Sequence, residues 1–353
     1  MIGIHLENSF SQVSFILVWK VNFRIITRTP FRISFAGGGS DLASFYKRRE
    51  GCVISASINK YMYVIVHPTF NREETIVKYS KTEIVKDVHT IKHDIARERL
   101  LELGLSGVEI VSTSDIPSGT GLSSSSAYAV GLVHALSAFQ GKLYSQEKIA
   151  EKACELEIER VGSHIGKQDQ YGTAIGGLKF IRFLPNGRVD VERLALSSEV
   201  LKALDDNLLL FYTGITHNAG EILKEQASNV ENDDSKFRNL VSMTHFARDM
   251  RDSLLEGRLS DFGHILHESW LLKRQLSNKI SNPFIEEQYS KALEAGAIGG
   301  KLLGAGGGGF MLFYCPNEKQ KDLRAALSEM TELPFNIEYS GSKIIYVGDK
   351  TWD

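Results

Sequence analysis

The chain has 353 residues, enough for one large domain or two smaller ones with a substantial hydrophobic core. Hydrophobic residues make up 42% and charged residues 24%, and the formal net charge is −2, so no basic excess indicates nucleic acid or a membrane surface as a partner. Cys52, Cys154 and Cys315 are far apart and form no CxxC pair, which argues against a zinc site or a disulfide framework and for a reducing, cytoplasmic setting.

The first 23 residues contain an apolar run at residues 13–19. No basic segment precedes this run, no small-residue cleavage site follows it, and seven residues are too few to span a bilayer. We therefore expect residues 1–23 to form a leader or an extra strand rather than a signal peptide.

Alternating apolar residues and turn residues predict a mixed first half. Strands are expected at 23–28, 32–36, 52–58, 61–67 and 75–79, helices at 91–103, 127–139 and 146–160, and a further strand at 176–183. Pro185, Asn186 and Gly187 then predict a hairpin turn. This pattern indicates a first α+β domain at residues 24–200.

The second half, residues 201–353, opens with an apolar strand at 207–212 and continues through helical patterns between 218 and 295. A glycine-rich stretch at 299–309 then leads into a strand at 310–314. Residues 304–309 satisfy GxGxxG, but a dinucleotide fingerprint needs a helix after the loop, whereas this loop runs into a strand. No GxxxxGK[ST] loop occurs either, so the two commonest nucleotide-binding folds are disfavoured.

A second glycine loop lies between a strand-like segment at 108–111 and the helix predicted at 127–139. The order of strand, glycine loop and helix is typical of a phosphate site, because loop N–H groups, hydroxyls and the helix amino end all attract an anion. A flexible linker or an ordinary helix cap is the alternative, and the lack of a gap before the helix disfavours the linker. The residues expected to bind ATP phosphates are Pro117, Ser118, Gly119, Thr120, Gly121, Leu122, Ser123, Ser124, Ser125 and Ser126.

Three segments of the chain, 30–41, 117–127 and 301–310, resemble in order and spacing the three signature motifs of the GHMP small-molecule kinases. Residues 28–39, 165–172 and 301–314 are most similar to the sugar kinases that act on D-glycero-D-manno-heptose phosphates, and also to fucokinase domains. The resemblance begins near Arg24. It implies a two-domain α+β fold, with an N-terminal β/α domain, a C-terminal ferredoxin-like α/β domain and ATP between them.

Phosphoryl transfer from ATP needs a metal ion that neutralises the phosphates. The resemblance implies that Ser125 and Glu157 bind Mg²⁺. Glu155 and Glu159 are competitors, because at most one of the three glutamates on one helix should face the site.

The transfer also needs a group that accepts or orients the proton of the attacking hydroxyl. The resemblance implies Asp169 in this role and Arg32 as the guanidinium that keeps it ionised. An ordinary surface arginine is the alternative for Arg32, but its place two residues after a proline and before a triple glycine favours the functional role.

The resemblance also implies an acceptor site. Asp41 matches the galactokinase aspartate that binds sugar hydroxyls, although it could instead be a helix cap. Gly38 and Gly39 stand where galactokinases carry sugar-contacting side chains, so galactose is disfavoured and a longer or phosphorylated sugar is favoured. Lys167 is a candidate for an acceptor phosphate, and each basic candidate could equally be a solvated surface charge; the others are Arg28, His164 and Lys60.

The resemblance thus implies an ATP- and Mg²⁺-dependent sugar kinase that phosphorylates the anomeric hydroxyl of heptose 7-phosphate in nucleotide-heptose biosynthesis. A fucokinase-like or other GHMP sugar kinase is the alternative enzyme, and mevalonate-pathway kinases are less similar at 167–170. A non-catalytic ATP- and sugar-binding regulator is disfavoured because the metal, base and cation candidates are all present. The expected partners are a sugar phosphate and ATP, with no nucleic acid or membrane, in a monomer or homodimer.

Overall fold

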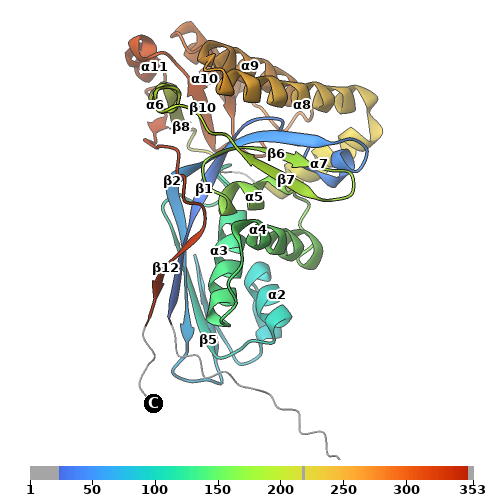
Figure 1. Cartoon of the computed structure of the whole chain (residues 1–353), viewed down its shortest axis with the longest axis vertical. Coiled ribbons are helices and arrows are strands. Elements are labelled where there is room, and N and C mark those ends of the chain that lie inside the picture. The colour runs from blue at the N-terminus through green and yellow to red at the C-terminus, as the bar shows by residue number, and fades with distance from the viewer. Residues whose placement is uncertain (1–23, 217–218, 349–353) are drawn as a thin grey trace, which may run out of the picture.

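The computed structural model of the chain describes residues 24–216 and 219–348. The leader or extra strand predicted at residues 1–23 lies outside these ranges. Within them, no helix is long and apolar enough to cross a membrane. The described residues form a mixed fold of helices and two sheets, as predicted (Figure 1).

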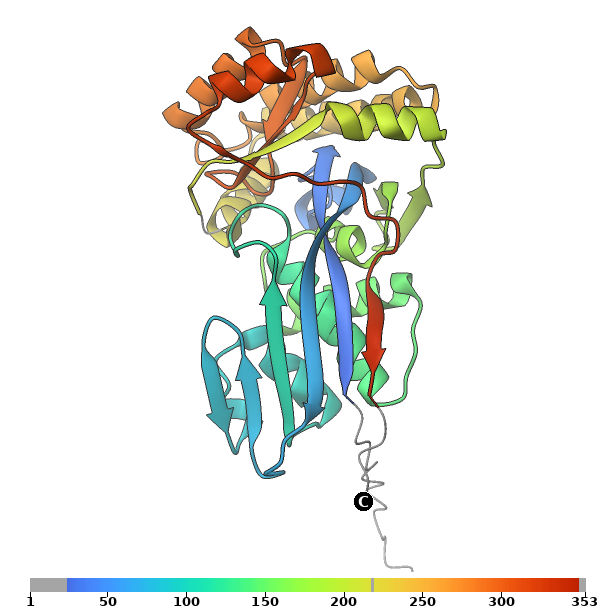
Figure 2. The ribbon, with the colours of Figure 1, turned by 90° about the vertical axis from the view of Figure 1, so that its left-hand side faces the viewer.

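The first sheet has eight strands, in the order β12-β1-β2-β5-β3-β4, and β6 and β7 extend it from β2. All pairings are antiparallel except that of β3 with β5. Figure 2 shows the long central strands of this sheet face on. The strands are β1 (Ile25–Ala36), β2 (Gly51–Pro68), β3 (Thr75–Lys78), β4 (Thr82–Val85), β5 (Val108–Ser114), β6 (Leu178–Phe183), β7 (Val189–Arg193) and β12 (Lys343–Val347).

Strands β1 and β2 are each continuous where the sequence pattern predicts two strands. The register of the β1/β2 pair shifts between Pro30 and Phe31, opposite the point where Asn59 and Lys60 lie between the paired residues Ile58 and Tyr61. Proline has no N–H to donate to the neighbouring strand, and the shift in register at Pro30 accommodates the proline without ending the strand. The predicted breaks were therefore wrong, and the same residues mark a shift in register instead.

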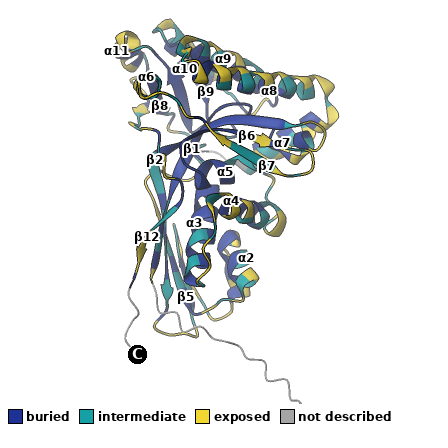
Figure 3. Ribbon diagram, viewed as in Figure 1, coloured by how far each residue is buried: buried dark blue, intermediate teal, exposed yellow. Residues whose placement is uncertain are grey.

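The longer helices of the first part lie on one face of this sheet (Figure 1). Helix α3 begins at Ser124, directly after the glycine loop, and most of its residues are buried, as Figure 3 shows. Its apolar sequence, rich in alanine and valine, lets it pack closely on β1 and β2. The elements are α1 (Ala43–Tyr46), η1 (Val88–Thr90), α2 (Asp94–Leu103), α3 (Ser124–Phe139), α4 (Gln146–Cys154), the π-helical η2 (Glu155–Arg160) and α5 (Gln168–Ala174).

The second sheet has four antiparallel strands, in the order β11-β8-β10-β9. Numbered along the chain, this order is 4-1-3-2, the order of the ferredoxin-like fold that was expected. Figure 1 shows α8, α9 and α10 gathered on this part of the molecule. Its elements are α6 (Ser198–Asn207), β8 (Leu208–Tyr212), α7 (Ala219–Asn232), α8 (Asp234–Leu255), α9 (Leu259–Lys273), α10 (Pro283–Glu294), β9 (Gly299–Leu302), β10 (Phe310–Tyr314), η3 (Asn317–Lys319), α11 (Gln320–Ala326) and β11 (Thr331–Glu332).

The two parts of the fold are not separate, because a strand near the end of the chain and a continuous apolar cluster connect them. After β11 the chain returns to the first sheet, where β12 pairs with β1, so the predicted second domain at 201–353 ends with a strand of the first sheet. The largest apolar cluster is also continuous between the parts, since Phe35 of β1 packs edge-on against Phe262 of α9 at 5.2 Å between ring centroids. This packing brings the glycine-rich stretch at 299–309 against the loop that precedes α3.

Candidate active site

The glycine loop joins β5 to α3 and takes a conformation that few residues adopt. Gly119 and Gly121 have φ values of 73° and 84°, and Ser123, the N-cap of α3, has a φ of 67°. A β-carbon on Gly121 would lie 2.6 Å from the carbonyl oxygen of Leu303, so only glycine allows this approach of the two loops. Gly304 lies against Gly121 in the same way, so the glycine run at 304–309 lets the two loops pack closely.

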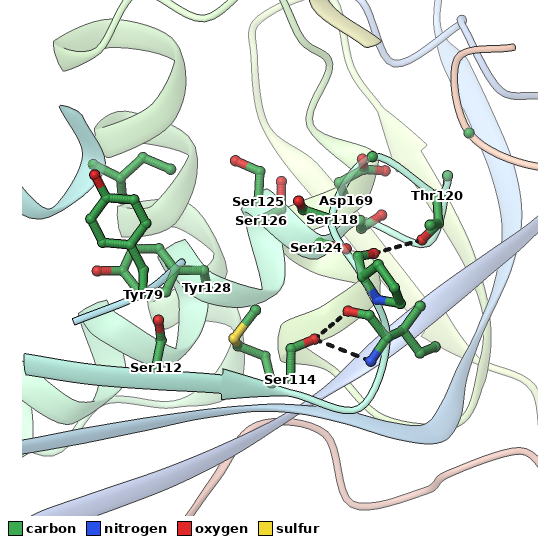
Figure 4. Close-up of a pocket in the computed structure, with 18 of the residues that line it drawn as sticks. Tyr79, Ser112, Ser114, Ser118, Thr120, Ser124, Ser125, Ser126, Tyr128 and Asp169 are labelled. Atoms are coloured by element: carbon green, nitrogen blue, oxygen red, sulfur yellow. Dashed lines mark hydrogen bonds between the residues drawn. The ribbon is translucent and has the colours of Figure 1, made fainter. Parts of the chain in front are cut away.

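A large cavity of about 810 Å³ opens beside this loop. We call it the larger cavity; Figure 4 shows Tyr79 and Tyr128 at one end and Ser118, Thr120 and Asp169 at the other. The ring of His93 lies 4.7 Å from that of Tyr79 and 4.8 Å from that of Tyr128, which makes this end aromatic. These three residues come from separate elements, and no motif in the sequence connects them.

Two serine hydroxyls of the loop are buried and lack a partner in the described part of the chain. They are the Oγ atoms of Ser123 and Ser124, both of which line the larger cavity. A buried hydroxyl without a hydrogen bond costs free energy, so such atoms point to a missing acceptor. Phosphate oxygens at the amino end of α3 would supply that acceptor, and the loop therefore fits the phosphates of ATP.

Glu157 reaches the same cavity from the π-helical segment η2 and is only 1% exposed. Its Oε1 accepts from Ser125 Oγ at 2.8 Å and its Oε2 from Gln170 Nε2 at 2.6 Å. Burial raises the pKa of Glu157 to about 6, against hydrogen bonds that lower it. Glu155 is partly exposed and Glu159 is exposed, and neither lines the cavity, so a single glutamate enters the site, as expected.

Arg32 on β1 and Asp169 in the first turn of α5 form an ion pair in which Arg32 is buried and Asp169 is partly exposed. Arg32 donates to Asp169 Oδ1 from Nε at 2.9 Å and from Nη2 at 2.7 Å, and its Nη1 donates to the carbonyl of Gly121 at 2.9 Å. The Oδ2 atom of Asp169 has no hydrogen-bond partner within the described ranges. The pair thus connects the glycine loop to a carboxylate oxygen that is free to meet a substrate.

A smaller cavity of about 40 Å³ adjoins the larger one. The two share five lining residues, Arg32, Ile165, Asp169, Leu223 and Gly304. Helix α7 closes the smaller cavity with Leu223 and Gln226. A molecule in one cavity would therefore meet a molecule in the other at the Arg32–Asp169 pair.

Asp41, Gly38 and Gly39 line the smaller cavity, where the acceptor was expected. Asp41 does not cap α1, whose N-cap is Leu42; its carboxylate accepts from the Gly39 N–H at 3.0 Å and from the Gln168 N–H and side-chain amide at 3.2 and 3.1 Å. Burial, followed by the charge of Asp169, raises the pKa of Asp41 to about 6. At Gly39 a β-carbon would lie 2.2 Å from Gln226 Nε2, so Gln226 fills the space on that side.

Lys167 lines neither cavity, because its Nζ donates to the carbonyl of Gly187 at 2.7 Å. Arg28 lies over the ring of Tyr61, at 4.2 Å from its centroid, and outside both cavities. Two lysines that the sequence analysis did not select, Lys273 and Lys301, line the smaller cavity instead. Lys301 stands in the third segment that resembles the family, and that position was the one signal available for it.

The donors around Ser125 and Glu157 suit Mg²⁺, which prefers oxygen ligands and is commonly held by one or two carboxylates together with substrate phosphates. No cluster of three or more metal-ligating His, Cys, Asp or Glu side chains occurs in the described part of the chain. The residues present therefore fit a metal ion that enters with the phosphates of a nucleotide rather than one held by the protein alone.

Comparisons with known proteins agree with this geometry. Residues 86–177 match the model of the GHMP kinases N terminal domain, and residues 250–333 match that of the GHMP kinases C terminal. The chain is 29% identical over 346 residues to the D-glycero-alpha-D-manno-heptose 7-phosphate kinase of Campylobacter jejuni subsp. jejuni serotype O:2, covering 93% of this chain and 98% of the relative. It is 31% identical to the mevalonate kinase of Thermococcus onnurineus over 67% of each chain.

Among solved structures, a D-glycero-D-manno-heptose 1-phosphate kinase from Bacteroides thetaiotaomicron superposes with a TM-score of 0.75 at 23% identity, covering 92% of this chain and all of that one. This similarity shows the fold. Both domain models, a relative that aligns along 93% of the chain and the junction of two cavities at a carboxylate lead to one assignment. The chain belongs to the GHMP kinase family and is an enzyme that transfers a phosphoryl group to an alcohol acceptor.

Proposed function

We propose that this sugar kinase uses ATP and Mg²⁺ to phosphorylate the anomeric hydroxyl of D-glycero-D-manno-heptose 7-phosphate, a step in making nucleotide-activated heptose. The observation that carries the proposal is the meeting of the two cavities at Arg32 and Asp169. The 29% identity to a heptose 7-phosphate kinase along 93% of the chain supports this acceptor.

In this proposal ATP occupies the larger cavity. Its base lies at the aromatic end, among Tyr79, His93 and Tyr128, where stacking surfaces are available. Its phosphates lie on the glycine loop, where the free hydroxyls of Ser123 and Ser124 donate to phosphate oxygens. The loop N–H groups and the amino end of α3 add positive potential at the same place.

Ser125 and Glu157 would hold Mg²⁺ beside the phosphates, and the bound ion supplies positive charge against the phosphate oxygens. Gln170 would keep the Glu157 carboxylate oriented toward the metal ion, because its Nε2 donates a hydrogen bond to Glu157 Oε2. Because Glu157 is buried, its negative charge is poorly solvated, and a cation would favour its ionised form.

The acceptor sugar lies at the junction of the cavities, with its reactive hydroxyl against Asp169. The free Oδ2 of Asp169 accepts or orients the proton of that hydroxyl. The hydroxyl oxygen of the sugar then attacks the γ-phosphorus of ATP. Arg32 fixes the carboxylate through two hydrogen bonds to Oδ1, so Oδ2 is the oxygen left for the acceptor. The bond from the γ-phosphorus to the bridging oxygen breaks, and ADP leaves with that oxygen.

Release of ADP, measured for a panel of sugars and sugar phosphates, tests the acceptor. Heptose 7-phosphate should give the highest kcat/KM, and phosphorus NMR of the product should show a phosphate on the anomeric carbon. If heptose phosphates are inert while free fucose is turned over, the acceptor is wrong and the fucokinase-like alternative replaces it. If no acceptor in the panel increases ADP release although ATP binds, a regulator becomes the better account.

A further inference from the structure

Lys273 at the end of α9 and Lys301 on β9 are buried lysines that line the smaller cavity; their exposed fractions are 6% and 2%. Lys301 Nζ donates to the carbonyl of Phe35 at 2.9 Å. Lys273 Nζ donates to the carbonyls of Leu302 and Gly304 at 3.1 and 2.6 Å. An ammonium group has three donors, so Lys301 keeps two and Lys273 keeps one for a further partner.

Neither lysine has a carboxylate as an ion-pair partner within residues 24–216 and 219–348. Of the two carboxylates on the cavity wall, Asp169 is paired with Arg32, and Asp41 accepts N–H groups on both oxygens. Burial and then the neighbouring cations lower the pKa of both lysines, that of Lys273 to about 7, although the charges of Asp169 and Asp41 act to raise the pKa of Lys273. Buried cations without an ion-pair partner are costly, and an anion between them would reduce that cost.

The two lysines line the smaller cavity and not the larger one. The glycine loop, by contrast, lies in the larger cavity with its free hydroxyls. The lysines therefore face the acceptor side of Asp169 rather than the phosphates of the nucleotide.

We propose that Lys273 and Lys301 form a binding site for the phosphate ester of the acceptor. This inference rests on the proposed function, because it takes the acceptor to be a phosphorylated sugar. The smaller cavity has room for about three water molecules, which is enough for an anionic group and too little for a whole sugar. The sugar ring therefore lies toward the junction, with its reactive hydroxyl at Asp169 and its phosphate between the lysines.

The alternative is that the two lysines only stabilise the fold, as a buried lysine outside the cavities would. Lys179 is such a residue. That side chain is also completely buried, and its Nζ donates to Ser57 Oγ at 3.0 Å and to the carbonyl of Gly177 at 2.9 Å. Lys179 lines neither cavity, so Lys179→Met is a matched control for the loss of a buried lysine.

The test compares kcat/KM for heptose 7-phosphate and for unphosphorylated heptose in the wild type and in the Lys273→Met, Lys301→Met and Lys179→Met variants. Lys273→Met removes a hydrogen bond between charged groups, and bonds of this kind contribute strongly to binding. The variant should therefore lower kcat/KM for the phosphorylated acceptor by about 10- to 100-fold, mainly through a higher KM. The value for the unphosphorylated heptose should change less than about threefold, because that acceptor never makes the contact. Lys179→Met should change both acceptors equally.

Inhibition by inorganic phosphate provides a second measurement, and its wild-type part does not depend on any variant folding. In the wild type it should inhibit competitively against the acceptor and not against ATP. In Lys273→Met this inhibition should weaken by at least as much as the affinity for the phosphorylated acceptor. Equal losses for both acceptors in Lys273→Met, or phosphate inhibition that competes with ATP alone, would overturn the site.

Failure of the acceptor assignment gives a different result. If heptose 7-phosphate is inert and another acceptor is turned over, the proposed function is wrong. Competition between inorganic phosphate and the true acceptor, with its loss in Lys273→Met, would still establish the anion site; no competition would exclude it.

Discussion

Asp41 has its carboxylate in a place where main-chain and amide N–H groups reach it, and burial raises its pKa from 3.8 to about 6. A carboxyl group with a raised pKa binds its proton more tightly in the folded state than in the unfolded state. Its contribution to stability is therefore present below pH 4 and is lost as the pH rises through 6. A shift of this size corresponds to about 3 kcal/mol.

The comparison of wild type with Asp41→Asn isolates this effect, because asparagine does not titrate. The free energy of unfolding of the wild type, relative to the variant, should fall by about 2 kcal/mol between pH 4 and pH 7 in urea titrations, because the rest of the effect lies below pH 4. Asp190→Asn is a control that should give a nearly flat difference over this range, because a hydrogen bond from Arg188 lowers the pKa of Asp190 below 3.8 and its effect on stability is lost only at lower pH. A flat difference for Asp41→Asn as well would show that Asp41 ionises freely.

Glu157 and Glu159 make a matched pair for the metal, because they are two residues apart and only Glu157 is buried in the site. Glu157→Gln keeps the shape and removes the charge, so the Mg²⁺ concentration for half-maximal turnover should rise by about tenfold or more. The melting temperature should not fall, since a buried charge is lost. Glu159→Gln should behave as wild type; an inactive Glu159 variant beside an active Glu157 variant would move the ligand.

The residues that the structure brings together were predictable where the family resemblance implied a role for them. Arg32, Asp169, Ser125 and Glu157 meet as expected. The acceptor-side cations were not predictable by the same means, because proximity to a motif in sequence led to Lys167, whose side chain is held by Gly187. Lys273 comes from a helix of the second part, and only the packing of that helix brings it to the cavity.

At the scale of elements, the sequence indicates where helices and strands lie better than how they end. The helix predicted at 146–160 is α-helical only to Cys154 and then π-helical to Arg160, with the Val161 N–H bonded to the carbonyl of Leu156 at 3.0 Å. The wider turn leaves Glu157 buried and Arg160 exposed, although an unbroken α-helix would put Arg160 on the apolar face with Leu156. Apolar periodicity assumes one helical pitch, so it could not reveal this change.

The contact between the glycine loop and the third glycine segment can be tested with Gly121→Ala. Its β-carbon would lie 2.6 Å from the carbonyl oxygen of Leu303, and the backbone has a φ of 84°. Gly141→Ala is the control, because Gly141 has a φ of 73° but no atom within 4 Å of an added β-carbon. Left-handed strain should destabilise both variants by about 1–2 kcal/mol.

Only Gly121→Ala should also raise the KM for ATP, because the loop must move away from Gly304 to admit the methyl group. Melting temperatures and ATP kinetics of the two variants measure the strain and the contact separately. Equal ATP kinetics in both would mean that the packing of the two loops does not shape the phosphate site.

At the scale of the whole molecule, the three motifs were enough to predict the two-part architecture. They did not predict that the end of the chain returns to the first sheet. The strand order 4-1-3-2 of the second sheet agrees with the ferredoxin-like fold that the resemblance implied. The return of β12 to β1 was not foreseen, since nothing local in residues 343–347 tells which sheet has a free edge. Long-range pairing of this kind depends on where the other strands leave an edge uncovered.

The central claim is that both halves of the molecule meet at Asp169, where the phosphoryl group passes from one cavity to the other. Asp169→Asn keeps the volume and removes the charge that accepts the proton, and Arg32→Met removes the guanidinium that fixes the carboxylate. Because both residues act on one proton, the double variant should be much less than multiplicatively impaired.

The most direct measurement is the turnover number of Asp169→Asn with saturating acceptor, alongside its ATP affinity and melting temperature. A general base contributes roughly 10²- to 10⁴-fold, so turnover should fall by that factor while ATP affinity and melting stay near wild type. A well-folded Asp169→Asn enzyme that keeps more than about a third of wild-type turnover would contradict the account.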